Sequence, residues 1–192
     1  METMTAEQAA EAAKGLTFEK IWAALMESRQ MADETLQRME KNIADLSKNI
    51  GGLGNSLGRF TEAMFSAEIL KKFYELGFQF NTQANHKKFY EGGQVLAEID
   101  SVLENGGYVM LVEIKTDLSV GNVEEHLERI AIIRKYMDAH SDARKLVGTV
   151  AGGVVPESVL KYAQKKGLYV LVQTGEAIAV ADMPQGFKAR EW

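Results

Sequence analysis

AEIDSVLENGGYVMLVEIKT, residues 97–116, is the stretch that decides the fold of this chain. Two runs rich in β-forming residues, at about 94–103 and 108–116, stand on either side of the pair Asn105-Gly106. Asn-Gly between two alternating runs is the strongest short-range signal for a β-hairpin. The stretch therefore predicts two antiparallel strands joined by a tight turn at Asn105 and Gly106.

This turn sets the expected register of the two strands. The pairs that follow from it are Leu103 with Tyr108, Ser101 with Met110, and Asp100 with Leu111. Because side chains alternate between the two faces of a strand, we expect Asp100, Glu113 and Lys115 on one face of the sheet. Asp100 and Glu113 then become diagonal neighbours, roughly 7–8 Å apart at the backbone.

The charges of Glu113 and Lys115 stand out because the rest of their strand is apolar and suited to burial. Burying a charge is costly unless the charge is paired or binds a metal. Two carboxylates that reach across the gap can share one divalent cation, since Mg–O bonds are about 2.0–2.1 Å long. The pattern indicates a metal site at Asp100 and Glu113 with Lys115 beside it. The alternative is a chance spacing in which Lys115 and Asp117 form a solvated strand end.

These residues resemble the signature of the PD-(D/E)XK nuclease superfamily, the fold of restriction endonucleases and Holliday-junction resolvases. In that signature an Asp near the end of one strand is followed by Glu-X-Lys at the end of the next. Asp100 and Glu113-Ile114-Lys115 match it. The superfamily usually adds an acid on the preceding helix, and Glu62 in GRFTEAMF matches that position.

The resemblance covers about residues 59–181, and Ile99 replaces the proline that gives the motif its name. It implies an α/β fold: a restriction-endonuclease-like core with a mixed central sheet flanked by helices, preceded by a long N-terminal helical coiled-coil arm. The implied order of elements is helix, three-stranded meander, helix, strand, helix, strand. With its arm, the chain looks more like bacterial members of the superfamily than like the well-studied nucleases.

The resemblance also implies roles for the residues, in a metal-dependent cleavage of DNA. Asp100, Glu113 and the backbone carbonyl of Ile114 would bind Mg²⁺ or Mn²⁺, which an oxygen-only ligand set prefers over Zn²⁺. Lys115 would orient the attacking water or neutralise the phosphate, and Glu62 would bind a water of the metal shell or a second ion. Glu98 is a candidate extra ligand, or else a polar residue at the margin of the sheet.

The N-terminal third has the period of a coiled coil. Apolar residues recur in alternating steps of four and three, with Arg29 and Ala32 at the intervening positions. The stripe consists of Phe18, Trp22, Leu25, Leu36, Met39, Ile43, Leu46, Ile50, Leu53, Leu57 and Phe60. So narrow a stripe needs a partner, so we expect self-association into a dimer or a larger assembly. The alternative is an amphipathic helix packed on its own domain.

The glycines between residues 51 and 58 divide the chain, because glycine weakens a helix. They indicate a flexible joint or a close approach of helices, and a domain boundary. We therefore expect a coiled-coil arm at 1–58, the nuclease-like core at 59–182 and a loose tail at 183–192.

Within the core, the expected elements alternate between helices and strands. They are a helix at 59–76, a strand starting at 78, the hairpin, a helix at 119–139 capped by Ser119 or Asn122, a strand at 145–151, a helix at 156–166, and strands at 169–173 and 177–180. Residues 85–93 are expected to form a loop. Its Lys87, Lys88, Phe89 and Tyr90 would contact a nucleic acid, or would form an ordinary solvated turn.

Composition limits the function further. The chain has 192 residues and no cysteine, which excludes disulfides, zinc-thiolate sites and cysteine nucleophiles. Its net charge of −5 argues against a protein that coats nucleic acid by bulk charge, so DNA binding would rely on local basic patches. No signal-peptide pattern and no apolar run of about 20 residues is present, so we expect a cytoplasmic protein without a membrane segment.

Two functions of different classes remain. The first is a metal-dependent DNA nuclease that oligomerises through its N-terminal helix. The second is a catalytically weak or inactive nuclease fold used for protein or nucleic-acid interaction. The Asp100 and Glu113-Ile114-Lys115 set favours the first function, while the acidic balance of the chain favours the second.

Overall fold

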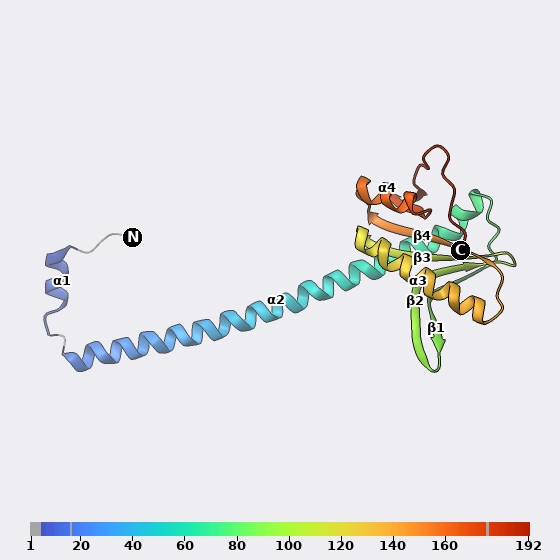
Figure 1. The fold of residues 1–192 in the computed structure, drawn as a ribbon. Helices are drawn as coiled ribbons and strands as arrows, with labels where there is room; N and C mark the ends of the chain where they lie inside the picture. Colours follow the sequence, from blue (N-terminus) through green and yellow to red (C-terminus); the bar gives the residue numbers. More distant parts are fainter. Residues whose placement is uncertain (1–4, 16, 176) are drawn as a thin grey trace. The chain divides into compact units, whose positions relative to one another are not determined.

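The computed structural model describes residues 5–15, 17–175 and 177–192 of the chain (Figure 1). Residues 1–4 and 16 of the expected arm, and residue 176, lie outside these ranges. The chain divides into two compact units, Met1–Leu53 and Gly54–Trp192. No helix in the described ranges is both long and apolar enough to cross a membrane.

The first unit is helical. It contains α1 (Ala6–Ala12) and the first part of α2 (Phe18–Glu75). The helix α2 continues through the glycines at 51–58, and the two compact units meet within this segment. The long N-terminal helix is therefore confirmed, whereas a coiled-coil partner for it stays a prediction.

The second unit is an α/β core around a six-stranded sheet with the order β1-β2-β3-β4-β5-β6. Its strands are β1 (Thr82–Glu91), β2 (Gln94–Glu104), β3 (Tyr108–Asp117), β4 (Lys145–Val154), β5 (Tyr169–Thr174) and β6 (Ala177–Val180). The first three strands form an antiparallel meander, β3–β4 and β4–β5 are parallel pairs, and β6 is antiparallel to β5. The helices α3 (Val120–Ala139) and α4 (Glu157–Lys165) make the two parallel connections.

Helices cover both faces of this sheet, and β3 shows which residues face which layer. Met110, Val112 and Ile114 belong to the apolar cluster formed with the C-terminal part of α2. Val109 and Leu111 belong to the cluster on the opposite face, formed with α3 and α4. The expected mixed sheet flanked by helices is confirmed, and so is the expected order of helix, three-stranded meander, helix, strand, helix, strand.

The predicted hairpin is present, but its turn and register differ from the prediction. A tight Asn-Gly turn needs positive φ at both residues, and neither Asn105 nor Gly106 has one. The Asn105 side chain instead accepts hydrogen bonds from the N–H groups of Gly107 and Tyr108, at 2.8 and 2.7 Å, and the Asn105 N–H donates to the carbonyl of Tyr108 at 3.0 Å, so the turn is centred on Gly106 and Gly107.

Because the turn lies one residue further along the chain than predicted, the strand pairing is displaced by two residues. The observed pairs are Leu103 with Met110, Val102 with Leu111, and Ser101 with Val112. A displacement by one residue would have turned every side chain to the other face, but a displacement by two keeps each on its expected face. The prediction that Asp100, Glu113 and Lys115 share a face therefore survives the error in register.

Elsewhere the predictions hold in part. The elements α3, β4, α4, β5 and β6 lie within a few residues of their expected positions, and Ser119 caps α3 in a capping box with Asn122. Residues 85–91, expected in a loop, belong to β1, which begins at Thr82 and not at residue 78. The two glycines that follow, and not the basic residues, form the turn to β2.

The tail is also not loose. The N–H of Trp192 donates to the carbonyl of Leu146 at 2.9 Å, and the N–H of Leu146 donates to Trp192 at 3.2 Å. The Glu191 carboxylate accepts a hydrogen bond from the Tyr108 hydroxyl and pairs with Lys145 at 2.7 Å. The end of the chain therefore pairs with β4, which sequence periodicity over a few residues does not reveal.

Candidate functional site

Asp100 and Glu113 lie side by side where β2 and β3 stop pairing. The backbone pairing of the two strands ends at Ser101 and Val112. Just beyond this pair, the N–H of Ile114 donates to Oδ2 of Asp100 at 2.7 Å. A side-chain carboxylate thus takes over the role of a backbone carbonyl. This bond holds the carboxylate of Asp100 against β3, next to Glu113.

Three oxygens converge on the ammonium group of Lys115. Its Nζ lies 2.5 Å from Oε1 of Glu113, 3.6 Å from Oδ2 of Asp100 and 3.3 Å from the carbonyl oxygen of Ile114. These are the three groups that the sequence predicted as metal ligands. They surround a single positive charge. The structure therefore brings together Asp100, Glu113, Ile114 and Lys115.

Glu113 receives a second cation from α3. Its side chain is only 1% exposed, and Oε2 accepts a hydrogen bond from Nη1 of Arg129 at 2.5 Å. Arg129 was not predicted from the sequence. Nothing in its local pattern distinguishes it, because α3 carries several other charged residues.

His126, one turn before Arg129, lies on the same side of α3 and is fully buried. Its Nε2 is 3.2 Å from the carbonyl oxygen of Leu111, and since a carbonyl only accepts, Nε2 carries the proton. Its Nδ1 is 3.9 Å from Oε2 of Glu113 and has no hydrogen-bond partner among the described residues. The sequence held a signal, because His126 falls in the buried stripe of α3 with Val123 and Ile130.

The two carboxylates of the site differ in their acidity. Burial raises the pKa of Asp100, and the negative charge of Glu113 raises it further. Burial also acts to raise the pKa of Glu113, but hydrogen bonds from Arg129 and Lys115 outweigh it, so the pKa of Glu113 is lowered. Two acids whose pKa values are pushed in opposite directions are a common property of functional sites.

The basic groups of the site follow the same logic. Burial acts to lower the pKa of Lys115, but its hydrogen bond to Glu113 and the charge of Asp100 prevail, so the pKa is raised. Burial lowers the pKa of His126 to about 4, so its imidazole is neutral at pH 7. The positive charges beside Glu113 at neutral pH are therefore those of Lys115 and Arg129.

Glu62 lies close to these residues on α2. Its neighbour Thr61 is buried, and the Thr61 hydroxyl is 3.3 Å from the Thr116 hydroxyl at the end of β3. The charge of Glu62 contributes to the raised pKa of Asp100. Its carboxylate also lies 3.5 Å from Nε2 of His86. Glu62 is thus at the rim of the site rather than among the groups around Lys115.

His86 marks an irregularity in β1 opposite Asp100. The pairing of β1 with β2 omits His86, whose φ of 52° lies in the left-handed region. Such a backbone costs on the order of 1–3 kcal/mol in a residue other than glycine and often occurs at functional sites. No role for His86 was predicted from the sequence.

The other candidates lie outside the cluster around Lys115. Glu98 pairs with Lys88 at 3.4 Å, and Lys87 pairs with Glu104 at 2.8 Å. Phe89 is buried, whereas Lys88 and Tyr90 are exposed. The basic and aromatic residues at 87–90 are therefore largely engaged within the protein.

The donor set fits a hard cation that keeps part of its water. In the described part of the chain, no three His, Cys, Asp or Glu side chains are grouped so as to hold a metal. The set is two carboxylates and one carbonyl, and Mg²⁺ is usually bound through one or two carboxylates with several waters. The convergence of these oxygens on the Lys115 ammonium shows that they can surround a positive charge.

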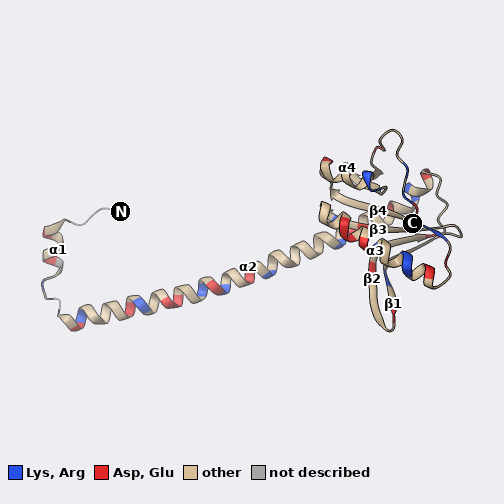
Figure 2. Ribbon diagram, viewed as in Figure 1, with Lys and Arg blue, Asp and Glu red and all other residues tan. Residues whose placement is uncertain are grey.

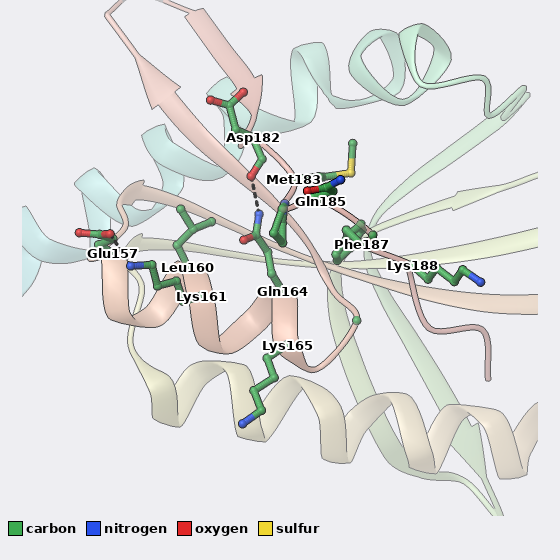
Figure 3. Close-up of a pocket in the computed structure, with 13 residues that line it drawn as sticks. Glu157, Leu160, Lys161, Gln164, Lys165, Asp182, Met183, Gln185, Phe187 and Lys188 are labelled. Carbon is green, nitrogen blue, oxygen red and sulfur yellow. Dashed lines mark hydrogen bonds and ion pairs between the residues drawn. The ribbon is translucent and has the colours of Figure 1, made fainter.

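A depression of about 670 Å³ lies elsewhere, between α4 and residues 182–188 (Figure 3). None of the predicted site residues lines it. Lys161 at its edge is paired with Glu157, and the amide of Gln164 donates to the carbonyl of Asp182. The depression therefore does not bear on the motif residues.

No family model and no curated protein matches the chain. Two solved structures are similar to part of it. One is a repair endonuclease from Pyrococcus abyssi, with a TM-score of 0.41 and 15% identity over 57% of this chain and 45% of that one. The other is the small subunit of the heterodimeric restriction endonuclease R.BspD6I, with a TM-score of 0.34 and 12% identity over 56% of this chain and 61% of that one. The chain spans less than two thirds of either.

Proposed function

We propose that this protein is a metal-dependent phosphodiesterase of the nuclease type that acts on DNA. Asp100, Glu113 and the carbonyl of Ile114 would bind Mg²⁺ or Mn²⁺. The observation that carries the proposal is the convergence of these three oxygens on Nζ of Lys115. DNA as the substrate rests on the resemblance of the motif to the PD-(D/E)XK signature.

The residues of the site suit the hydrolysis of a phosphodiester. A divalent cation supplies Lewis acidity and lowers the pKa of a bound water. Lys115, about one third exposed, can donate to a phosphate oxygen or hold the attacking water once the carboxylates have another positive partner. Glu62, at the rim, can accept a hydrogen bond from water in the same space.

Metal binding can be tested by thermal unfolding with and without Mn²⁺. At a Mn²⁺ concentration about 100 times the Kd, binding should stabilise the folded protein by about 2.7 kcal/mol. Asp100→Asn should abolish this stabilisation, because it removes the charge but keeps an oxygen that accepts from Ile114. Asp117→Asn, at the exposed end of β3, is the matched control and should behave like the unaltered protein. Equal stabilisation of the Asp100→Asn variant would refute the site.

A second candidate function is that of an interaction module. The observation that favours it is the charge balance of the site, since Lys115 and Arg129 already neutralise Glu113 without a metal. Cleavage assays with Mn²⁺ on double-stranded, single-stranded and branched DNA, and on RNA, separate the two functions. Absence of cleavage on all of them would favour the interaction module.

We also propose that the chain self-associates through α2. The large apolar side chains of the stripe from Phe18 to Phe60 are between 51% and 76% exposed. Lys and Arg alternate with Asp and Glu along the same helix (Figure 2), as expected around the seam of a coiled coil. An apolar stripe of this length is unfavourable in water without a partner.

Light scattering on the full-length chain tests this association. Replacing Ile43 and Ile50 together by Asp should convert a dimer or larger species into a monomer, because both lie in the stripe. The control Lys48→Asp changes charge in the same turns but outside the stripe. A monomeric full-length protein at micromolar concentration would refute self-association without affecting the metal site.

A further inference from the structure

Each carboxylate oxygen of Glu113 is held by a different cation. Oε1 lies 2.5 Å from Nζ of Lys115, and Oε2 lies 2.5 Å from Nη1 of Arg129. His126 does not replace Arg129, because its Nδ1 is 3.9 Å from Oε2, beyond hydrogen-bond distance. Since Glu113 is almost fully buried, Arg129 is what keeps Oε2 from being an unsatisfied buried acceptor.

The four charged groups of the cluster that contains Glu113 balance one another before any metal arrives, while Glu62 and Glu125 lie at its margin. Asp100 and Glu113 contribute two negative charges, and Lys115 and Arg129 contribute two positive ones. A divalent cation added to this cluster would create an excess of positive charge in a partly buried place, where such an excess is costly. Metal binding therefore favours the departure of one cation from Glu113 or the arrival of an anion.

Arg129 is suited to leave Glu113. Its side chain is 31% exposed, and Nη2 already lies 3.6 Å from Oε2 of the exposed Glu125. Its guanidinium has donors arranged in a fork that matches two oxygens of a phosphate. Lys115, in contrast, is tied to all three candidate ligands through one nitrogen.

We propose that Arg129 is an exchangeable counter-ion of Glu113 that also binds the substrate. It holds Oε2 when no divalent cation is bound, and it donates to a phosphate of the DNA once a cation bound to Asp100 and Glu113 supplies the positive charge that these carboxylates need. This inference rests on the proposed function. It follows that cation and phosphate each favour the binding of the other, because together they restore the charge balance.

Two titrations of Arg129→Gln test the exchange. In calorimetry with Mn²⁺ alone, the variant should bind about fivefold more tightly or better, because a competing cation has been removed. In fluorescence anisotropy with a labelled DNA duplex and Ca²⁺, the same variant should bind about fivefold more weakly or worse. A residue with a purely structural role would weaken both. Lys135→Gln, an exposed position on α3, removes a positive charge elsewhere and should change neither.

Arg129→Lys provides a second variant if Arg129→Gln does not fold. It keeps the charge but loses the fork, so Mn²⁺ affinity should stay near that of the unaltered protein while DNA binding weakens. The inference would be overturned if a folded Arg129→Gln variant bound Mn²⁺ as tightly as the unaltered protein or more weakly. It would also be overturned if Arg129→Lys bound DNA as tightly as the unaltered protein. Neither result would affect the proposed function. Absence of Mn²⁺ binding in the unaltered protein would instead overturn the proposed function.

Discussion

The core contains two clusters of paired charges that share the strand β2 but differ in burial. The Glu113 cluster consists of Asp100, Glu113, Lys115 and Arg129, and the Glu104 cluster consists of Lys87, Glu104, Asp142 and Arg144. Each has two acids and two bases. In the Glu104 cluster every side chain is between 20% and 32% exposed, whereas Glu113 is 1% exposed.

This difference changes what each pairing does. The pairs of the Glu104 cluster connect β1, β2 and the start of β4. Because water can replace any partner that is lost, each of these pairs contributes little to the stability of the fold. A hydrogen bond from Arg144 lowers the pKa of Asp142, as is usual for a paired acid. In the Glu113 cluster, burial raises the pKa of Asp100 instead. Pairing alone thus does not distinguish the two clusters, whereas burial and convergence on one point do, and these two properties support the Glu113 cluster as the candidate site.

The largest effect is expected on the cleavage rate of the Lys115→Ala variant. If the Glu113 cluster is catalytic, the variant should lose at least about 10²-fold in cleavage rate, the usual effect of removing one donor to a developing negative charge. Stabilisation by Mn²⁺ should persist, because the oxygen ligands remain. The matched variant in the Glu104 cluster, Arg144→Ala, should cleave at the unaltered rate. Equal losses in both variants would remove the distinction between the clusters.

The change in the free energy of unfolding with pH should depend on His126. Its pKa is about 4 in the folded protein and near 6.5 in the unfolded chain, so only the unfolded chain takes up this proton between those values. Stability should therefore fall by about 3 kcal/mol as the pH decreases from 6.5 to 4. Urea unfolding at pH 7 and 4.5 should show a smaller loss for His126→Gln. The exposed His140→Gln should retain the full loss, and an unchanged loss in His126→Gln would contradict the assignment.

The two arginines should differ in their effect on stability. Without metal, Arg129→Gln should destabilise the fold by about 2 kcal/mol, because it leaves a buried carboxylate oxygen without its donor. Arg144→Gln should cost about 1 kcal/mol or less, because its partners reach water. Denaturant unfolding of the two variants measures this directly. A larger cost for Arg144→Gln would reverse the comparison.

The smallest effect is expected at Glu62, which is intermediate in burial and lies at the rim of the site. Glu62→Gln should slow cleavage about tenfold, as for a residue that acts through a water or a neighbouring ligand. Asp100→Asn should slow cleavage much more. Single-turnover cleavage of a DNA duplex in Mn²⁺ compares them, and an equal loss in both variants would place Glu62 among the direct ligands.

Much of the fold could be predicted because it depends on local periodicity. The positions of α3, β4, α4, β5 and β6 follow from apolar spacing, capping residues and glycines. The turn was predicted one residue too early, because Asn105 closes it through its side chain and its N–H, rather than occupying it with a left-handed backbone. The paired tail was missed, because its bonds to Leu146 and Lys145 join segments that are distant in the sequence.

The sequence by itself determined which residues of the hairpin share a face. Alternation along a strand has a period of two, so Asp100, Glu113 and Lys115 stay together even though the register was wrong by two. Only the tertiary structure decided what surrounds them. Arg129 reaches Glu113 from α3 because of how that helix packs across β3, a long-range contact that no local pattern encodes. Likewise, the left-handed backbone of His86 arises where β1 passes Asp100 in the folded sheet.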